Sequence, residues 1–213
     1  MLFKKKNNIR GGKDIRSINI LPAWLVILEK LAYVKIKQIL EPKIPNFQFG
    51  FKEGSDCNLA KTLTWYNSMK LGLKKQLLID IQKAFDSINR NKLKEMVSKD
   101  FDEEDKTIIN RFIEIYDNIQ YNVLGKYIYP TKGGPQGSSL IPLLFSYYIE
   151  NSIKNCRLKI SYKMQLYADD IIIQAKTIEE LSDIYHCLKA ELEKINLTIN
   201  TEKYQIISDD PMV

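Results

Sequence analysis

The sequence predicts an α+β protein that forms one compact unit. Segments with apolar residues at helical spacing alternate along the chain with short runs rich in Ile, Leu and Tyr, which are typical of strands. Of the 213 residues, 45% are hydrophobic and 27% are charged, an ordinary balance for a globular protein that excludes general disorder. Neither an internal repeat nor a low-complexity linker divides the chain, so we expect a single domain with a subregion at its N-terminal end.

Helices are expected where apolar side chains recur every three or four residues. The first extends from Ala23 to about Leu40 and ends before Pro42, because proline cannot continue a helix. The second follows a glycine-rich turn and is capped by Ser55 or Asp56. The expected ranges beyond the first helix are about 56–70, 89–99, 103–118, 140–154 and 179–195.

Strands are expected in the short apolar segments between these helices. Residues 76–81 (QLLIDI) predict a buried strand, and residues 121–129 a strand or hairpin. Two further strands, at 164–167 and 171–174, flank an acidic turn, and 197–207 predicts a turn followed by a strand. The segment KGGPQGSS before the 140–154 helix predicts a loop in which Ser139 caps that helix.

Positive charge gathers at the N-terminus. The chain has 32 Lys and Arg against 26 Asp and Glu, a net charge of +6, and six basic residues against one acid place +5 of it within residues 1–20. This segment is either a solvated terminus or an arm that binds phosphate groups.

Histidine and cysteine chemistry is largely excluded. The chain has one histidine, His186, and its three cysteines lie far apart, so a histidine pair, a disulfide framework and a zinc cluster are not expected. The longest apolar run, Leu21–Leu28, is far shorter than the roughly 20 residues of a membrane span. The sequence therefore predicts a soluble intracellular protein, of unknown compartment, without membrane partners.

Three acidic residues have the pattern of a metal site. Asp80 lies inside an apolar strand, where an unpaired charge costs several kcal/mol, so it should be paired, ligated or at the end of the strand. Asp169 and Asp170 form a turn, which on its own is usually only a turn. Adjacent to Asp80, however, the pair would form an oxygen-only site suited to Mg²⁺.

The order of the motifs resembles the reverse transcriptase family, of the non-LTR retrotransposon and group II intron type. A glycine loop alone predicts only a loop-to-helix turn, but six segments occur in the family's order and cover nearly the whole chain. They are DIRSIN at 14–19, FGFKEGS at 49–55, DIQKAFDSI at 80–88, GPQGS at 134–138, YADD at 167–170 and NTEK at 200–203.

The resemblance implies a polymerase palm, an antiparallel sheet packed on helices, with a partial fingers subdomain. Residues 1–75 would be mainly fingers and 76–213 mainly palm, with fingers-type helices near 89–130. Only ten residues follow Lys203, so we expect the thumb to be absent and to be supplied by a protein partner or a downstream segment.

The resemblance also assigns site residues. Asp80, Asp169 and Asp170 would be catalytic and would bind two Mg²⁺ ions, with Mn²⁺ as an alternative. Phe85 would exclude a 2′-hydroxyl from the sugar site, although packing in the core explains it equally well. Nucleotide-binding roles are implied for Lys5, Lys6, Arg16, Ile81, Phe85, Gln136 and Lys203, and template-binding roles for Gly134, Pro135, Gln136 and Gly137. Lys203 would lie near the leaving pyrophosphate or be an exposed structural lysine, and Asp86 would be structural, as a helix cap.

The implied function is RNA-templated DNA synthesis. A primer 3′-hydroxyl would attack a deoxynucleoside triphosphate, with an RNA template and primer as partners, in a fragment or minimal core of a retroelement polymerase. The alternative is a catalytically silent module of the same fold that binds RNA or serves a structural role. An RNA-dependent RNA polymerase would share the acids, but Phe85 and the Tyr167-Ala168 context are less typical of one.

Overall fold

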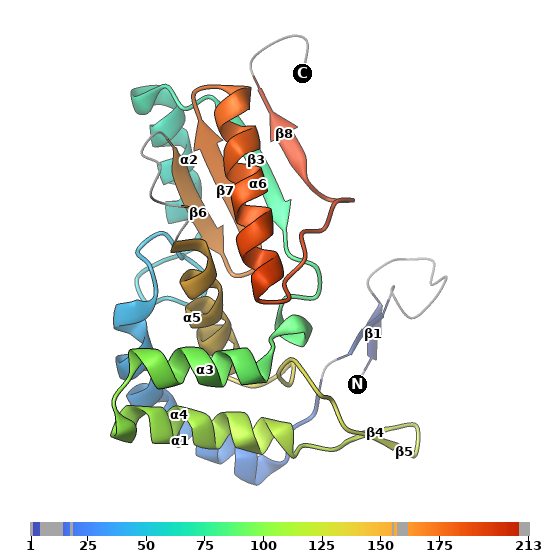
Figure 1. The fold of residues 1–213 in the computed structure, drawn as a ribbon. Helices are drawn as coiled ribbons and strands as arrows, with labels where there is room; N and C mark the ends of the chain where they lie inside the picture. Colours follow the sequence, from blue (N-terminus) through green and yellow to red (C-terminus); the bar gives the residue numbers. More distant parts are fainter. Residues whose placement is uncertain (1, 5–14, 18, 155, 157–161, 209–213) are drawn as a thin grey trace.

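A four-stranded antiparallel sheet forms one half of the molecule, the upper half in Figure 1. The structure is a computed structural model that describes residues 2–4, 15–17, 19–154, 156 and 162–208. Adjacent strands pair without a parallel crossover, which is typical of an α+β fold. In spatial order the strands are β6 (Lys163–Tyr167), β7 (Asp170–Ala175), β3 (Lys75–Asp80) and β8 (Gln205–Ile207).

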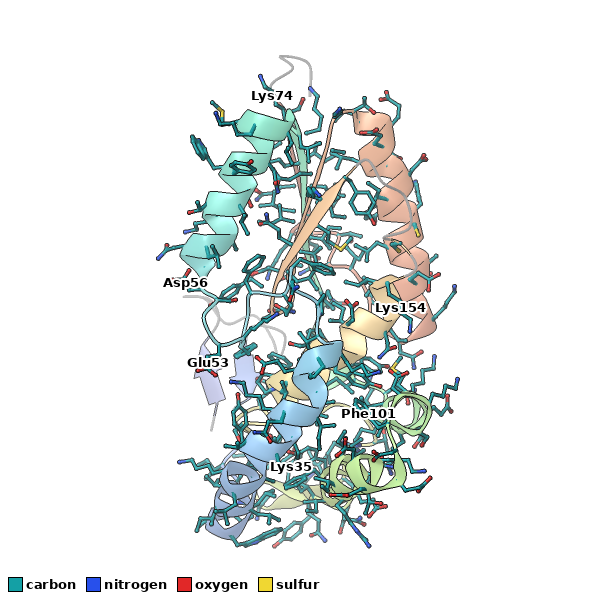
Figure 2. All side chains as sticks on the ribbon, turned by 90° about the vertical axis from the view of Figure 1, so that its left-hand side faces the viewer. Lys35, Glu53, Asp56, Lys74, Phe101 and Lys154 are labelled. Atoms are coloured by element: carbon teal, nitrogen blue, oxygen red, sulfur yellow. The ribbon has the colours of Figure 1, made fainter. Side chains whose placement is uncertain are left out.

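Helices cover both faces of this sheet. Figure 2 shows α2 (Cys57–Leu71) on one side and α6 (Ile178–Lys194) on the other. Asp56 caps α2 by accepting a hydrogen bond from the Leu59 amide, and Thr177 forms a capping box with Glu180 at the start of α6. Alternate residues of each strand therefore point into two different interfaces.

A helical layer lies beyond one end of the sheet (Figure 1). Four helices pack there around the main hydrophobic core, and α5 also contacts α6, which joins the two layers. Their ranges are α1 (Ala23–Leu40), α3 (Arg90–Asp100), α4 (Glu103–Asp117) and α5 (Ile141–Ile153). Short 3-10 turns, η2 (Glu41–Lys43) and η3 (Phe85–Ser87), connect elements of this layer to the sheet.

Two small hairpins extend from this framework. The first joins β1 (Leu2–Lys4) to β2 (Ile15–Ser17), and its pairing was not predicted from the sequence. The second joins β4 (Tyr121–Val123) to β5 (Lys126–Ile128), within the segment 121–129 that was predicted to be a strand or hairpin. Within the described part of the chain, no helix combines the length and the apolarity needed to cross a membrane.

The helix and strand predictions are confirmed to within a few residues, but two caps are wrong. Ser139 does not cap α5: its amide and hydroxyl bond elsewhere, and the amides of Leu140 and Ile141 donate to the hydroxyl of Ser138. Asp86 is not a helix cap either, because Asn89 accepts the hydrogen bond at the start of α3. In both cases a residue one or three positions away accepts the hydrogen bonds at the start of the helix. The spacing of residues in the sequence does not resolve a helix end to within so few residues.

Candidate active site

The strand register brings the predicted acids together at one corner of the sheet. Asp80, the last residue of β3, pairs directly with Asp170, the first residue of β7. Residues paired across an antiparallel ladder point to the same face, so both carboxylates lie on the side of the sheet that α2 covers further along. Leu77 and Ile79, which alternate with the outward positions of β3, are buried and point to the opposite face of the sheet.

Asp169 occupies the turn that joins β6 to β7. Tyr167 pairs with Asp170, which leaves Ala168 and Asp169 as the two turn residues. Ala168 has a φ of 58°, in the left-handed region that non-glycine residues rarely adopt. The carbonyl of Asp169 accepts a hydrogen bond from the Ile81 amide (3.2 Å), so the turn is tied to the end of β3.

The segment at 47–50 holds this turn from outside. Gln48 is fully buried, and its side-chain oxygen accepts hydrogen bonds from the amides of Ala168 (3.1 Å) and Gly50 (2.9 Å). The Phe49 amide also donates to the Leu166 carbonyl (2.8 Å). A Cβ on Gly50 would lie 2.4 Å from the Ala168 nitrogen, so only glycine permits this approach. Gln48 was not identified from the sequence, since its partner is 120 residues away.

Two side chains from the NTEK segment hold Asp80. The Asn200 amide donates to one carboxylate oxygen (2.8 Å), and the Lys203 ammonium donates to the other (2.9 Å). The Asn200 backbone amide also donates to the Asp80 carbonyl (2.8 Å). Its hydrogen bond with Asp80 raises the pKa of Lys203, with smaller contributions from Asp170 and Asp169. Lys203 therefore stays protonated beside the acids.

The acids at the corner repel one another. Burial raises the pKa of Asp170, and the nearby carboxylates of Asp169 and Asp80 raise it further, while Lys203 lowers it. The corner thus holds more negative charge than its lysine neutralises. A cation bound there would remove this repulsion.

The donor chemistry fits Mg²⁺, although the carboxylates as they stand do not enclose an ion. Within the described ranges, no group of three or more Asp, Glu, His or Cys side chains is close enough to count as a metal cluster. Carboxylate oxygens are nevertheless the type of ligand that Mg²⁺ and Mn²⁺ prefer. The ammonium of Lys203 already provides a positive charge at Asp80.

Two residues beside the corner are constrained by the core. The Ile81 side chain is buried, so its predicted role in nucleotide binding is limited to its backbone. Phe85, in η3, is half-buried: its ring packs edge-on against the buried Phe145 (5.3 Å between centroids) and the exposed Phe51 (6.4 Å). Both sequence interpretations of Phe85, a core residue and a residue at a binding surface, are compatible with this position.

The glycine loop packs on η3. The amides of Gly133 and Gly134 donate to the carbonyls of Ile88 (2.7 Å) and Phe85 (3.0 Å). The Gln136 side chain donates to both carboxylate oxygens of Asp86 (2.9 and 3.0 Å), which gives Asp86 a structural role.

The other end of the loop is joined to the chain that follows β2. The backbone amide of Gln136 donates to the side-chain oxygen of Asn19, and the backbone amide of Asn19 donates to the backbone carbonyl of Gln136 (both 2.8 Å). Gly137 has a φ of 127°, and a Cβ there would lie 2.8 Å from the Asn19 carbonyl oxygen. Pro135, between these contacts, is buried.

A buried carboxylate that the sequence interpretation missed supports this loop. Glu29, in α1, accepts hydrogen bonds from the Tyr116 hydroxyl (2.7 Å) and from the amide and hydroxyl of Ser139 (2.8 and 3.1 Å). Ser138 shares a further hydrogen bond with Tyr116 (3.0 Å). Burial and the neighbouring Glu29 raise the pKa of Tyr116. An acid on a helix gave no signal, because both of its partner residues, Tyr116 and Ser139, lie on other elements.

The predicted basic nucleotide contacts at the N-terminus are only partly described. Lys5 and Lys6 lie outside the described residues. Arg16 lies in β2, opposite Phe3 in the hairpin register. Their roles stay predictions.

Comparison with known proteins decides the family. The sequence matches the family model of reverse transcriptase (RNA-dependent DNA polymerase) over residues 3–212. This chain belongs to the reverse transcriptase family. The resemblance predicted from the six motifs is therefore confirmed.

The chain is similar in sequence to an intron protein and in structure to telomerase. An uncharacterized 91 kDa protein in a cob intron of Schizosaccharomyces pombe is 27% identical over 167 residues, which are 72% of this chain and 18% of that protein. Telomerase from Candida tropicalis, in complex with a TWJ fragment of telomeric RNA, has a TM-score of 0.65 at 18% identity and covers 89% of this chain. Telomerase from Candida albicans has a TM-score of 0.59 at 12% identity and covers 90%.

The structural likeness confirms the fold class, a polymerase-type palm with helices. At these identities it shows the fold alone. The reverse transcriptase chain spans 35% of each of these two telomerase chains and 18% of the intron protein.

Proposed function

We propose that this reverse transcriptase domain catalyses RNA-templated DNA synthesis, joining a primer 3′-hydroxyl to a deoxynucleoside triphosphate with release of pyrophosphate. The observation that carries the proposal is the register that pairs Asp80 with Asp170 and ties the Asp169 turn to the end of β3. Asp80, Asp169 and Asp170 would hold two Mg²⁺ ions. Bound there, the ions would activate the attacking hydroxyl and stabilise the charge of the triphosphate.

The chain's own residues would bind and orient the substrates. Lys203 keeps an ammonium beside the acids and is suited to the charge of the departing pyrophosphate. The Phe85 ring would contact the sugar of the nucleotide, where an aromatic side chain excludes a 2′-hydroxyl. Gln136 is fixed by Asp86 and Asn19, which suits the loop at 134–137 for contact with the template and the new base pair. Such positioning provides most of the rate in phosphoryl-type transfers.

The proposal includes partners and a division of the chain. Residues 1–75 would supply mainly fingers and 76–213 mainly palm, with fingers-type helices near 89–130. An RNA template, a primer and deoxynucleotides are the substrates, and a thumb would come from a partner protein or a further segment. One structural relative is described in complex with telomeric RNA, which supports an RNA partner. The domain would act as a fragment or minimal core of a retroelement polymerase.

One observation favours a second candidate, a catalytically silent module that binds RNA or serves a structural role. Among the described residues, the carboxylates do not form a ready metal cluster. In that case the Asp80–Lys203 ion pair would be a structural contact.

Primer extension on an RNA template separates the two candidates. With Mg²⁺ and deoxynucleotides we expect extension that stops on chelation with EDTA and in Asp169→Ala. Asp183→Ala is the matched control, because it removes an exposed acid from α6, on the opposite face of the sheet. RNA binding without extension by the wild type would favour the silent module. Extension with ribonucleotides at an equal rate would contradict the role of Phe85.

A further inference from the structure

The β4–β5 hairpin has the surface of a binding element rather than of a structural one. Its apolar side chains face solvent: Tyr127 is 64% exposed, Tyr129 61% and the tip residue Leu124 94%. A two-stranded hairpin without a buried face is marginally stable in water. Exposed apolar and aromatic groups in such an element indicate a surface that is covered when a partner binds.

The tip of the hairpin is a strained two-residue turn. Val123 pairs with Lys126, so Leu124 and Gly125 form the turn, and both have positive φ (53° and 82°). Glycine adopts this conformation without cost, but a large apolar residue does not, and asparagine or aspartate would be the usual choice at the first position. The Asn122 side chain stabilises the turn by accepting a hydrogen bond from the Gly125 amide (2.9 Å).

The base of the hairpin is fixed beside the glycine loop. Arg90 is buried and donates hydrogen bonds to the carbonyls of Pro130 and Gly133 (the latter 2.8 Å), and its Nε pairs with Asp117. Burial raises the pKa of Tyr121, in β4, to about 12, and the nearby Asp86 adds to this while Arg90 opposes it. The hairpin therefore starts next to the Asp86 carboxylate that holds Gln136.

Charge favours a polyanion as the partner. From residue 118 to 132 the chain contains Lys126 and Lys132 and no acid. The nearest acid along the chain, Asp117, is neutralised by Arg90 and Lys94. Side chains at alternate positions of an extended segment point to one face, so Tyr127, in β5, and Tyr129, just after it, are placed on the same face of the hairpin. Lysines with exposed aromatic rings are the combination that binds single-stranded nucleic acid by backbone attraction and base stacking.

We propose that the β4–β5 hairpin is a stacking platform for single-stranded RNA, which guides the template strand toward the loop at 134–137. The assignment rests on the proposed function for the identity of the strand as template. The rings of Tyr127 and Tyr129 stack on unpaired bases, and Lys126 neutralises the backbone.

The test measures RNA binding without catalysis. Fluorescence anisotropy follows the full chain binding a labelled, unstructured 12-nucleotide RNA, in EDTA and without nucleotides. Tyr127→Ala with Tyr129→Ala should weaken binding about tenfold or more, since stacking on one aromatic ring contributes about 1–3 kcal/mol per base. The matching phenylalanine pair should stay within about twofold of wild type, because stacking does not need the hydroxyl.

Two further variants complete the test, one as a control and one as a probe of charge. Tyr66→Ala removes a similarly exposed tyrosine from α2 and should leave the affinity unchanged. Lys126→Gln should reduce the slope of log affinity against log salt by about 0.7, the value for one phosphate contact on a single strand. If thermal melting shows that the alanine pair is unfolded, the single Tyr127→Ala variant and Lys126→Gln decide.

Three results would overturn the platform. One is unchanged affinity in the alanine variants, and another is an equal loss in the phenylalanine pair. The third is a change of oligomeric state in the alanine pair with unchanged RNA affinity, which would make the hairpin a protein contact. If RNA binding follows the expected pattern but no primer is extended, the platform stands and the polymerase proposal fails.

Discussion

The carboxylate of Glu29 and the three carboxylates at the sheet corner are held in opposite ways in this reverse transcriptase. Glu29 is buried, and both of its oxygens accept hydrogen bonds from neutral donors fixed on α4 and on the loop before α5. At the sheet corner, Asp80, Asp169 and Asp170 share the ammonium of Lys203, whose side chain is 63% exposed. Both oxygens of Glu29 thus have hydrogen-bond donors within the protein. The three acids at the corner still repel one another, because Lys203 neutralises only part of their charge.

The difference shows how structural and functional acids can be distinguished. A buried carboxylate with all of its hydrogen bonds made contributes to stability, and its loss leaves other polar groups unpaired. Acids held close together repel one another and cost stability, in keeping with the raised pKa of Asp170, and such arrangements cluster at functional sites. Glu29 should therefore be sensitive in unfolding experiments, and the corner acids in activity assays.

The largest effect is expected for Asp80→Asn. Primer extension should fall at least about a thousandfold, a loss of about 4 kcal/mol in transition-state stabilisation. The free energy of unfolding should change by less than about 1 kcal/mol, because the lost ion pair involves an exposed lysine. Urea denaturation of the same preparation measures the second quantity. A variant that is both inactive and strongly destabilised would show that Asp80 is structural, like Glu29.

Glu29→Ala should have the converse profile. We expect a loss of about 2 kcal/mol in the free energy of unfolding, because the buried Tyr116 hydroxyl loses its acceptor and the two donors of the exposed Ser139 lose theirs. Urea denaturation followed by circular dichroism measures it. Glu95→Ala, an exposed acid on α3, is the control. Unchanged stability in Glu29→Ala would contradict the comparison.

Gly50→Ala tests the support of the acidic turn. The added Cβ would lie 2.4 Å from the Ala168 nitrogen, so the segment at 47–50 or the acidic turn must move. We expect a loss of about 2 kcal/mol in the free energy of unfolding and primer extension that is about tenfold slower. Gly54→Ala is the control, since Gly54 has a φ of 71° but nothing within 4 Å of the added Cβ. It should lose some stability through backbone strain and retain activity. Full activity in Gly50→Ala would show that the turn needs no support from this segment.

The smallest effect is a gain in stability for Asp170→Asn. Burial and the neighbouring acids raise the pKa of Asp170, so its charged form destabilises the folded state above that pKa. At neutral pH the variant should be more stable than wild type by at most about 1 kcal/mol, since the group is partly exposed. The difference should shrink as the pH falls through the folded-state pKa and disappear below the ordinary value of 3.8. Thermal melts from pH 7 to pH 3.5 measure it, and a variant less stable than wild type at neutral pH would contradict the repulsion.

Some residues were beyond prediction for a specific reason. Gln48 and Glu29 are polar residues in segments whose pattern predicts only a turn and an amphipathic helix. Their importance comes from partners 120 and 110 residues away, and no local periodicity encodes such a contact. The cap at α5 failed for a related reason, because Glu29 draws Ser139 away from the helix end.

The sequence by itself determined most of the elements, the family and the positions of the three acids, because helix and strand periods are local and the six motifs keep their order. Only the tertiary structure decided that Asp80 faces Asp170 and that Lys203 and Asn200 hold Asp80, since strand register is set by the packing of both sheet faces. It also decided which carboxylates have all of their partners within the protein and which do not. That distinction depends on burial and on contacts between distant segments, which are properties of the folded chain.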